Sequence, residues 1–187
     1  MHNHLPKIYY FIDELDVNII NHLNKKIAII YRNYHKKPII KDIRIFKNYC
    51  RKNNQKFFIA NYADLAFKLK LDGAYIPSFN KENRLKKYNH NKKFLLIGSA
   101  HNLKEIKIKE KQGISQIFLS PIFKIDKSKR YLGINKFNLL SRSTKLPIIA
   151  LGGLTKHNIR KIKMTKSYGF ASISLIKNRN KLSNLIV

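Results

Sequence analysis

Two adjacent glycines follow an apolar run that is typical of a buried strand. The run covers residues 146–151, and Gly152 and Gly153 come directly after it. Because glycine has no side chain, backbone N–H groups at this point can approach a ligand closely. Backbone donors between the end of a strand and the start of a helix suit a phosphate group. The pair therefore predicts an anion site at the end of this strand.

Polar residues also follow most of the other apolar runs. These residues are Arg32, Asn61, Ser99, His101, Ser120, Ser172 and Ser174. Taken alone, Asn61 could cap a helix, Ser120 and Pro121 could form a turn, and His101 could be an exposed loop histidine. Their shared position after strands instead favours one common site, in which an arginine could grip a phosphate or diphosphate with two hydrogen bonds.

Short β-type runs alternate with helical patterns along the whole chain. The predicted strands cover residues 7–12, 26–31, 56–60, 74–76, 93–97, 116–119, 146–151 and 169–176. The predicted helices cover 38–52, 64–71, 81–90, 103–111, 135–142 and 156–165, with short helical turns after Asp13 and at 181–185. This alternation indicates an α/β protein with a parallel sheet.

Eight such units favour closure into a (β/α)8 barrel, also called a TIM barrel, with an open doubly wound sheet as the alternative. We expect one compact domain over residues 1–187, although barrels of this kind usually need about 250 residues. In a barrel the carboxyl ends of all strands share one face, where active sites lie. The polar residues named above would then meet on that face.

The composition limits the setting and the partners of the protein. Cys50 is the only cysteine, which excludes an internal disulfide and favours a reducing cytoplasm. Its spacing with Ile43 and Phe46 places it on the apolar face of a helix, so we expect a core residue. No apolar run approaches the roughly 18 residues of a membrane span. We therefore expect a cytoplasmic protein that does not contact a membrane.

The chain is strongly basic, with 39 Lys and Arg against 10 Asp and Glu. Such an excess is typical of proteins that bind nucleic acids or other anions. The basic residues are spread along the chain, which favours compositional drift over a nucleic-acid surface. A small phosphorylated ligand is compatible with either explanation.

Several motifs, taken in order, resemble the thiamine phosphate synthase / TenI family. The most specific are residues 97–101 (IGSAH), 120–123 (SPIF), 150–154 (ALGGL) with Asn158, and 169–176 (GFASISLI). Arg32, residues 59–61 (IAN) and residues 72–76 (DGAYI) precede them in the matching order. The resemblance extends from about residue 7 to residue 176.

The resemblance implies a barrel that joins hydroxymethylpyrimidine diphosphate to thiazole phosphate and releases pyrophosphate with Mg2+. It places Arg32 on the diphosphate, Ser99 near the pyrimidine, and Lys129, or Lys127 under another alignment, as the loop lysine. Arg32, Ser99 and Lys129 are thus the predicted catalytic residues. The predicted substrate-binding residues are Asn61, His101, Ser120, Ser128, Gly152, Gly153, Ser172 and Ser174, with the glycines and Ser174 cradling the thiazole phosphate.

The chain departs from the family where the metal ligands belong. Tyr62 and Asn80 occupy the positions of two metal-binding acids, and Tyr34 replaces a lysine. Pro121 replaces the histidine of the tautomerase branch. Because Mg2+ prefers carboxylate oxygens, we expect no metal site in the free protein and Mg2+ only together with a diphosphate. Asp126 is the one acid that we expect near that site.

Three hypotheses follow from the sequence. The first is an active synthase in which arginine and lysine replace part of the metal's charge. The second is a non-catalytic member that binds thiamine phosphate or its precursors, and the third is a basic nucleic-acid-associated barrel. The partners expected first are phosphorylated thiamine precursors, while the sequence leaves open whether the chain forms a homo-oligomer.

Overall fold

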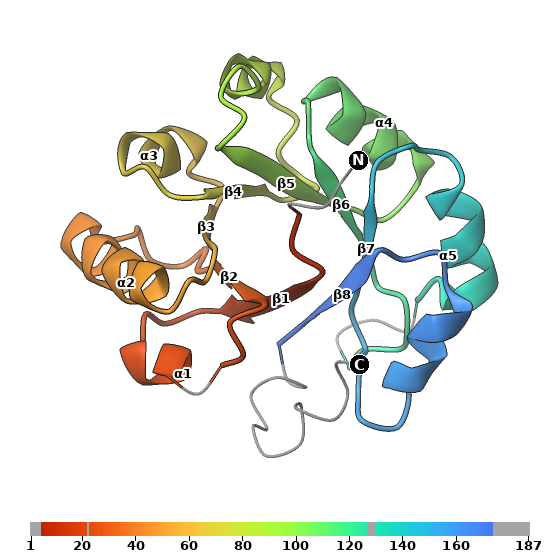
Figure 1. Cartoon of the computed structure of the whole chain (residues 1–187). Helices are drawn as coiled ribbons and strands as arrows, with labels where there is room; N and C mark the ends of the chain where they lie inside the picture. Colours follow the sequence, from red (N-terminus) through yellow and green to blue (C-terminus); the bar gives the residue numbers. More distant parts are fainter. Residues whose placement is uncertain (1–4, 22, 127–129, 174–187) are drawn as a thin grey trace.

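Eight parallel strands close into a barrel (Figure 1). The structure is a computed structural model that describes residues 5–21, 23–126 and 130–173. The strands follow one another around the barrel in chain order, and the last pairs with the first. They are β1 (Ile8–Ile12), β2 (Ile27–Tyr31), β3 (Phe57–Ala60), β4 (Gly73–Ile76), β5 (Leu95–Ala100), β6 (Gln116–Leu119), β7 (Ile148–Leu151) and β8 (Gly169–Ser172). The predicted barrel is confirmed, and the open sheet is excluded.

Helices surround the barrel on the outside (Figure 1). The α-helices are α1 (Val17–Asn21), α2 (Ile40–Lys52), α3 (Ala63–Lys68), α4 (Leu103–Lys111) and α5 (Gly133–Ser141). Two further connections, predicted as helices over 81–90 and 156–165, form the short 3-10 helices η1 (Asn83–Tyr88) and η2 (Ile159–Met164). Short helices of this kind explain how the barrel is built from 187 residues.

The two 3-10 helices have a common cause in their apolar spacing. In η1 the inward side chains are Leu85 and Tyr88, and in η2 they are Ile159 and Ile162. Each pair stands three residues apart, which matches the repeat of a 3-10 helix. A longer α-helix would need further apolar residues to pack against the barrel, and these segments are otherwise mostly polar.

Aromatic side chains fill the inside of the barrel. Tyr9, Phe11, Tyr75 and Phe118 pack edge to face, with ring centroids 4.8 Å apart for Tyr9 and Phe118 and 5.2 Å apart for Phe11 and Tyr75. A second core lies between the strands and the helices. The strands are therefore buried on both faces, which is why they read in the sequence as continuous apolar runs.

Polar contacts lie beneath this aromatic cluster at the amino end of the barrel. The hydroxyl of Tyr9 donates to Oε1 of the buried Gln116, and Nε2 of Gln116 donates to the Pro6 carbonyl at 3.0 Å. These contacts and the rings above them fill the barrel below the carboxyl ends of the strands. Among the described residues, these contacts close the amino end of the barrel axis, so we look for a ligand site at the carboxyl end.

Several predicted boundaries are wrong, and three of them show particularly large or informative differences. The helix predicted from residue 38 begins at Ile40, because Ile39 is extended and the preceding chain is held in a turn by Asn33. The strand predicted over 93–97 continues to Ala100, because Ser99 and Ala100 pair with β6. The last strand, predicted over 169–176, ends at Ser172, and residues 174–176 lie outside the described residues.

Two other expectations concern the core and the membrane. Cys50 is buried in α2 against the outer core, as predicted. Within the described ranges, no helix is both long and apolar enough to span a membrane.

Candidate active site

Six of the residues predicted from the sequence line one cavity of about 540 Å³ at the carboxyl end of the barrel. They are Arg32, His101, Ser120, Gly152, Gly153 and Ser172. Lys124 and Asp126, from the loop after β6, line the same cavity. The cavity therefore combines backbone, hydroxyl and cationic groups that come from the ends of β2, β5, β6, β7 and β8. This set of groups suits a phosphorylated ligand.

The glycine pair after β7 is required by its surroundings. Both residues have left-handed backbones, with φ of +92° at Gly152 and +70° at Gly153. A Cβ atom at Gly152 would lie 2.8 Å from Pro121 Cβ, and one at Gly153 would lie 2.5 Å from the carbonyl oxygens of Phe123 and Lys124. No described residue accepts a hydrogen bond from either glycine N–H. These two donors are thus free to bind a ligand.

Arg32 and Ser99 both lie next to Tyr75. The Arg32 guanidinium stands over the Phe11 ring, with its central carbon 4.6 Å from the ring centroid. Ser99 is buried within β5 and faces the Tyr75 side chain. Burial raises the pKa of Tyr75, while hydrogen bonding with Ser99 and the charge of Arg32 act in the opposite direction. Tyr75 therefore stays a neutral phenol that links two of the predicted catalytic residues.

Neither Asn61 nor Ser99 lines the cavity, and the Asn61 amide contacts Asn80. Asn80 Nδ2 donates to Asn61 Oδ1 at 2.8 Å, which joins the end of β3 to the loop after β4. Asn61 has a left-handed backbone with φ of +64°, and its N–H donates to the Tyr75 carbonyl at 2.8 Å. The residue is therefore not a helix cap, and α3 is preceded by Tyr62 instead.

This donor set does not fit a divalent metal. The corner between β3 and β4 supplies two amide side chains that bind each other, where Mg2+ would need carboxylates. The nearby Asp64 is held by Lys87 at 2.9 Å and by the Tyr88 hydroxyl, and these bonds lower its pKa. No cluster of three or more acidic, histidine or cysteine side chains occurs in the described parts of the chain.

Aromatic rings stand at the rim beside the amide pair. Tyr34 and Phe79, from the loops after β2 and β4, are both exposed and lie 5.6 Å apart between ring centroids. Partial desolvation by the surrounding residues and the neighbouring Tyr75 raise the pKa of Tyr34. Both rings are therefore uncharged at neutral pH, while the Arg32 charge lies close enough to oppose part of this shift.

His101 is held by a residue that sequence reasoning missed. Glu105 Oε2 accepts hydrogen bonds from the His101 N–H and from its Nδ1 atom, both at 2.8 Å. Burial acts to raise the pKa of Glu105, but the bonds from His101 outweigh it and hold the pKa below its ordinary value. Asn102 at the start of α4 followed three residues later by glutamate is a capping-box pattern that could have predicted this contact.

Four predicted residues cannot be placed in this cavity. Lys127, the alternative loop lysine, lies outside the described residues together with Ser128, Lys129 and Ser174. The roles assigned to these four residues stay predictions.

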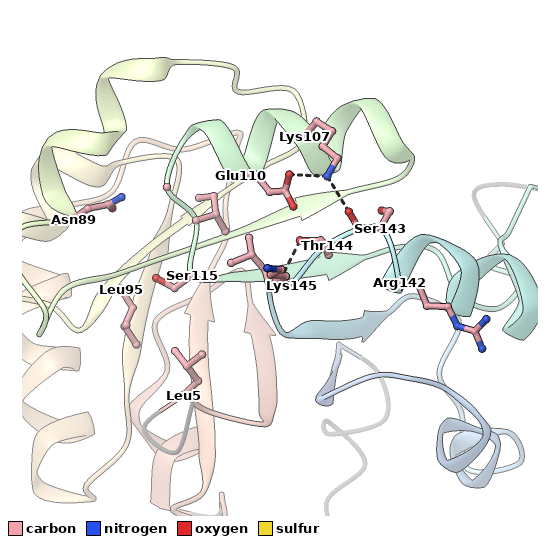
Figure 2. A pocket seen from close by; sticks show the side chains of 13 residues that line it. Leu5, Asn89, Leu95, Lys107, Glu110, Ser115, Arg142, Ser143, Thr144 and Lys145 are labelled. Atoms are coloured by element: carbon pink, nitrogen blue, oxygen red, sulfur yellow. Dashed lines mark hydrogen bonds and ion pairs between the residues drawn. The ribbon is translucent and has the colours of Figure 1, made fainter. Parts of the chain in front are cut away.

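A second hollow, of about 940 Å³, opens at the opposite end of the barrel (Figure 2). Lys107 lies across it, donating to Glu110 Oε2 at 2.9 Å and to the Ser143 carbonyl at 2.8 Å. Arg142 points away from this pair (Figure 2). Lys107 and Glu110 form an ion pair in this hollow, Arg142 and Lys145 also line it, and none of the predicted site residues does. The smaller cavity is therefore the better candidate for chemistry, in agreement with the usual location in barrels.

Comparisons with known proteins agree with the arrangement of the motifs. Residues 18–176 match the family described as thiamine monophosphate synthase. The chain is 30% identical over 131 residues to a thiamine-phosphate synthase of Methanococcus vannielii, an alignment that covers 67% of this chain and 62% of that protein. It is 35% identical over 131 residues to a thiamine-phosphate synthase of Prochlorococcus marinus, covering 67% and 37% of the two chains. The chain thus spans less than two thirds of the length of these relatives.

A solved structure shows the same fold. It is titled thiamine phosphate pyrophosphorylase from Pyrococcus furiosus, and it superposes with a TM-score of 0.71 at 20% identity, covering 90% of this chain and 86% of that one. The family match covers most of the chain and includes the strand ends that form the cavity. The chain belongs to the thiamine monophosphate synthase family.

Proposed function

We propose that this protein is a transferase that joins hydroxymethylpyrimidine diphosphate to thiazole phosphate and releases pyrophosphate. The observation that carries the proposal is the cavity at the carboxyl end, where Arg32, Ser120, Gly152, Gly153 and Ser172 meet. Family membership supplies the reaction, and the cavity supplies groups that suit two phosphorylated substrates.

In this proposal the glycine pair binds the thiazole phosphate. The free N–H groups of Gly152 and Gly153 donate to phosphate oxygens, and Ser172 lies beside them on the neighbouring strand. Lys124 at the rim adds positive charge. The rigid support behind the glycines means that these donors need little rearrangement when the phosphate binds.

Arg32 binds the diphosphate in the same proposal. The bond between the pyrimidine methylene carbon and the diphosphate oxygen breaks, and the oxygen keeps the electron pair. The thiazole ring nitrogen donates its lone pair to the same carbon and forms the new carbon–nitrogen bond. Arg32 then stabilises the negative charge that develops on the leaving group. The Tyr75 side chain interacts with both Arg32 and Ser99, so it connects the two residues.

We further propose that the protein alone forms no divalent-ion site, and that Mg2+ enters only with a diphosphate. Asp126 is the carboxylate that lines the described cavity, and Asn61 and Asn80 are amides committed to each other. The same amide pair also favours a second candidate function, a family member that binds thiamine precursors without turnover.

Incubation with both precursors, with and without Mg2+, tests the proposal by the formation of thiamine phosphate. We expect product from the wild type and a large loss in Arg32→Met. Arg142→Met is the matched control, because that arginine lies at the opposite end of the barrel (Figure 2). Binding of thiazole phosphate without any product would support the non-catalytic candidate. Binding of neither precursor, together with salt-sensitive RNA binding, would contradict both.

A further inference from the structure

A lysine is completely buried beneath the loop that follows β4. Lys109, in α4, has no exposed surface, and its Nζ donates at 2.8 Å to each of the Pro77 carbonyl, the Asn80 carbonyl and Gln112 Oε1. Gln112 is equally buried, and its Nε2 donates at 3.1 Å to the carbonyls of Asn80 and Glu82. The two side chains thus hold the loop from its inner side.

The charge of Lys109 is not cancelled by a bonded carboxylate. Its three acceptors are neutral oxygens, and the neighbouring Glu105 is bonded to His101 and Asn102. Burial lowers the pKa of Lys109 to about 8, so the ammonium form still predominates at neutral pH. Burying a charge without a counter-ion is costly, and a neutral side chain of similar length would fill the same space. Packing alone therefore does not account for a lysine here.

The bonds to Lys109 orient the peptide groups of the loop. In a trans peptide the N–H of the next residue points opposite to the carbonyl, and the one cis bond among the described residues lies elsewhere. The Pro77 and Asn80 carbonyls point at Lys109, so the N–H groups of Ser78 and Lys81 point away from it. Neither N–H donates to a described residue. The outer side of the loop consequently presents free donors above a buried positive charge.

The same loop is linked through Asn61 and Tyr75 to Arg32, the predicted diphosphate residue. Asn80 bonds to Asn61, the Asn61 N–H bonds to the Tyr75 carbonyl, and the Tyr75 side chain adjoins Arg32. An anion held by Arg32 would therefore lie beside a loop whose dipoles and buried charge favour negative ligands. This is the corner where the amides fail to provide a metal site.

We propose that Lys109 is a positioning residue that takes the electrostatic place of a divalent metal, so that the loop after β4 binds a phosphate or diphosphate anion without a metal ion. This inference rests on the proposed function for the identity of its ligand. The lysine does not touch the ligand; it fixes the loop and supplies a positive charge behind it at neutral pH. Gln112 completes the support and leaves the outer donors free.

The test is calorimetric binding of inorganic pyrophosphate to the full chain in EDTA and in Mg2+. It uses about 0.15 M salt, which screens nonspecific attraction to exposed charges. We expect the wild type to bind in EDTA, with less than about a twofold gain from Mg2+. Lys109→Met should weaken binding by about tenfold or more, since a buried charge is poorly screened. Lys111→Met removes the same charge from an exposed position of α4 and should change the affinity less than about twofold.

A third variant separates the charge from a purely structural role. Lys109→Met combined with Asn61→Asp and Asn80→Asp should regain pyrophosphate binding only when Mg2+ is present. Equal effects of Lys109→Met and Lys111→Met would overturn the proposal. If Lys109→Met does not fold, the wild type decides alone, because a tenfold or greater gain from Mg2+ would also overturn it. Pyrophosphate binding does not require turnover, so failure of the synthase assay and failure of this inference are distinguishable.

Discussion

Replacing Gly153 by alanine tests whether the loop after β7 is as tightly braced as its geometry indicates. A Cβ at this position would lie 2.5 Å from two carbonyl oxygens of the loop after β6. The other side of the turn is held by Asn158, whose Nδ2 donates to the Gly153 carbonyl at 2.7 Å and whose Oδ1 accepts the Thr155 N–H at 2.8 Å. The turn therefore cannot move away from the new methyl group without breaking these contacts.

Gly133 provides a control for the backbone part of this effect. Its φ of +66° is nearly that of Gly153, at +70°, but nothing lies within 4 Å of the position that an alanine methyl group would take there. Both alanine variants should lose about 1–2 kcal/mol because L-residues disfavour this conformation. Gly153→Ala should lose about 1–3 kcal/mol more, because the overlap forces neighbouring backbone to shift. For a chain of this size, the extra loss corresponds to a Tm lower by about 6 °C.

Thermal unfolding followed by circular dichroism measures the difference between the two variants. Calorimetric titration with thiazole phosphate then shows whether the displaced turn still binds the ligand. We expect Gly133→Ala to bind normally and Gly153→Ala to bind at least about tenfold more weakly, because its N–H donors are moved. Equal melting temperatures, or wild-type affinity in Gly153→Ala, would show that the turn yields easily and that our reasoning about its rigidity is wrong.

Further predictions concern three charged residues, Arg32, Asp126 and Lys109. Arg32→Lys should weaken diphosphate binding by about 1–3 kcal/mol, because lysine cannot form the two parallel hydrogen bonds of a guanidinium. An unchanged affinity measured by calorimetry would show that Arg32 does not bind the diphosphate. Titration of the free protein with Mg2+ should show no micromolar binding. Micromolar binding that Asp126→Asn abolishes would contradict our proposal that the free protein has no metal site. The lowered pKa of Lys109, about 8, means that the unfolded chain binds more protons between about pH 8 and 10.5. The free energy of unfolding should therefore rise with pH across this window. Chemical denaturation should show a rise that is about 1–3 kcal/mol larger in the wild type and in Lys111→Met than in Lys109→Met.

The barrel and the cavity could be predicted because they depend on patterns local to each strand. The strand before Gly152 carries apolar side chains on both faces. The polar site residues follow where the strands stop pairing with their neighbours. Arg32 and His101 follow strands whose type is clear from a few residues. Once the strands are known to be parallel, their carboxyl ends must share a face, and the site residues come together without any further information.

The contacts that could not be predicted join segments distant in the chain. The pairing of Asn61 with Asn80 depends on the path of the loop after β4, and nothing local to either asparagine indicates it. Lys109 occurs in a helix with several other lysines, and only its burial distinguishes it. The extension of β5 to Ala100 likewise results from its pairing with β6. Each of these features depends on a partner that single-sequence periodicity does not identify.

The pairing of β8 with β1 has a consequence for synthesis of the chain. Ile8 aligns with Phe170, so β1 keeps an open edge until β8 has been synthesised. That strand, Ile8–Ile12, is entirely apolar or aromatic and contains neither proline nor charge. An exposed edge of this kind readily pairs with other chains, and such distant contacts form slowly. We therefore expect that slower or interrupted translation near the C-terminal strand promotes aggregation more than the same change earlier in the chain.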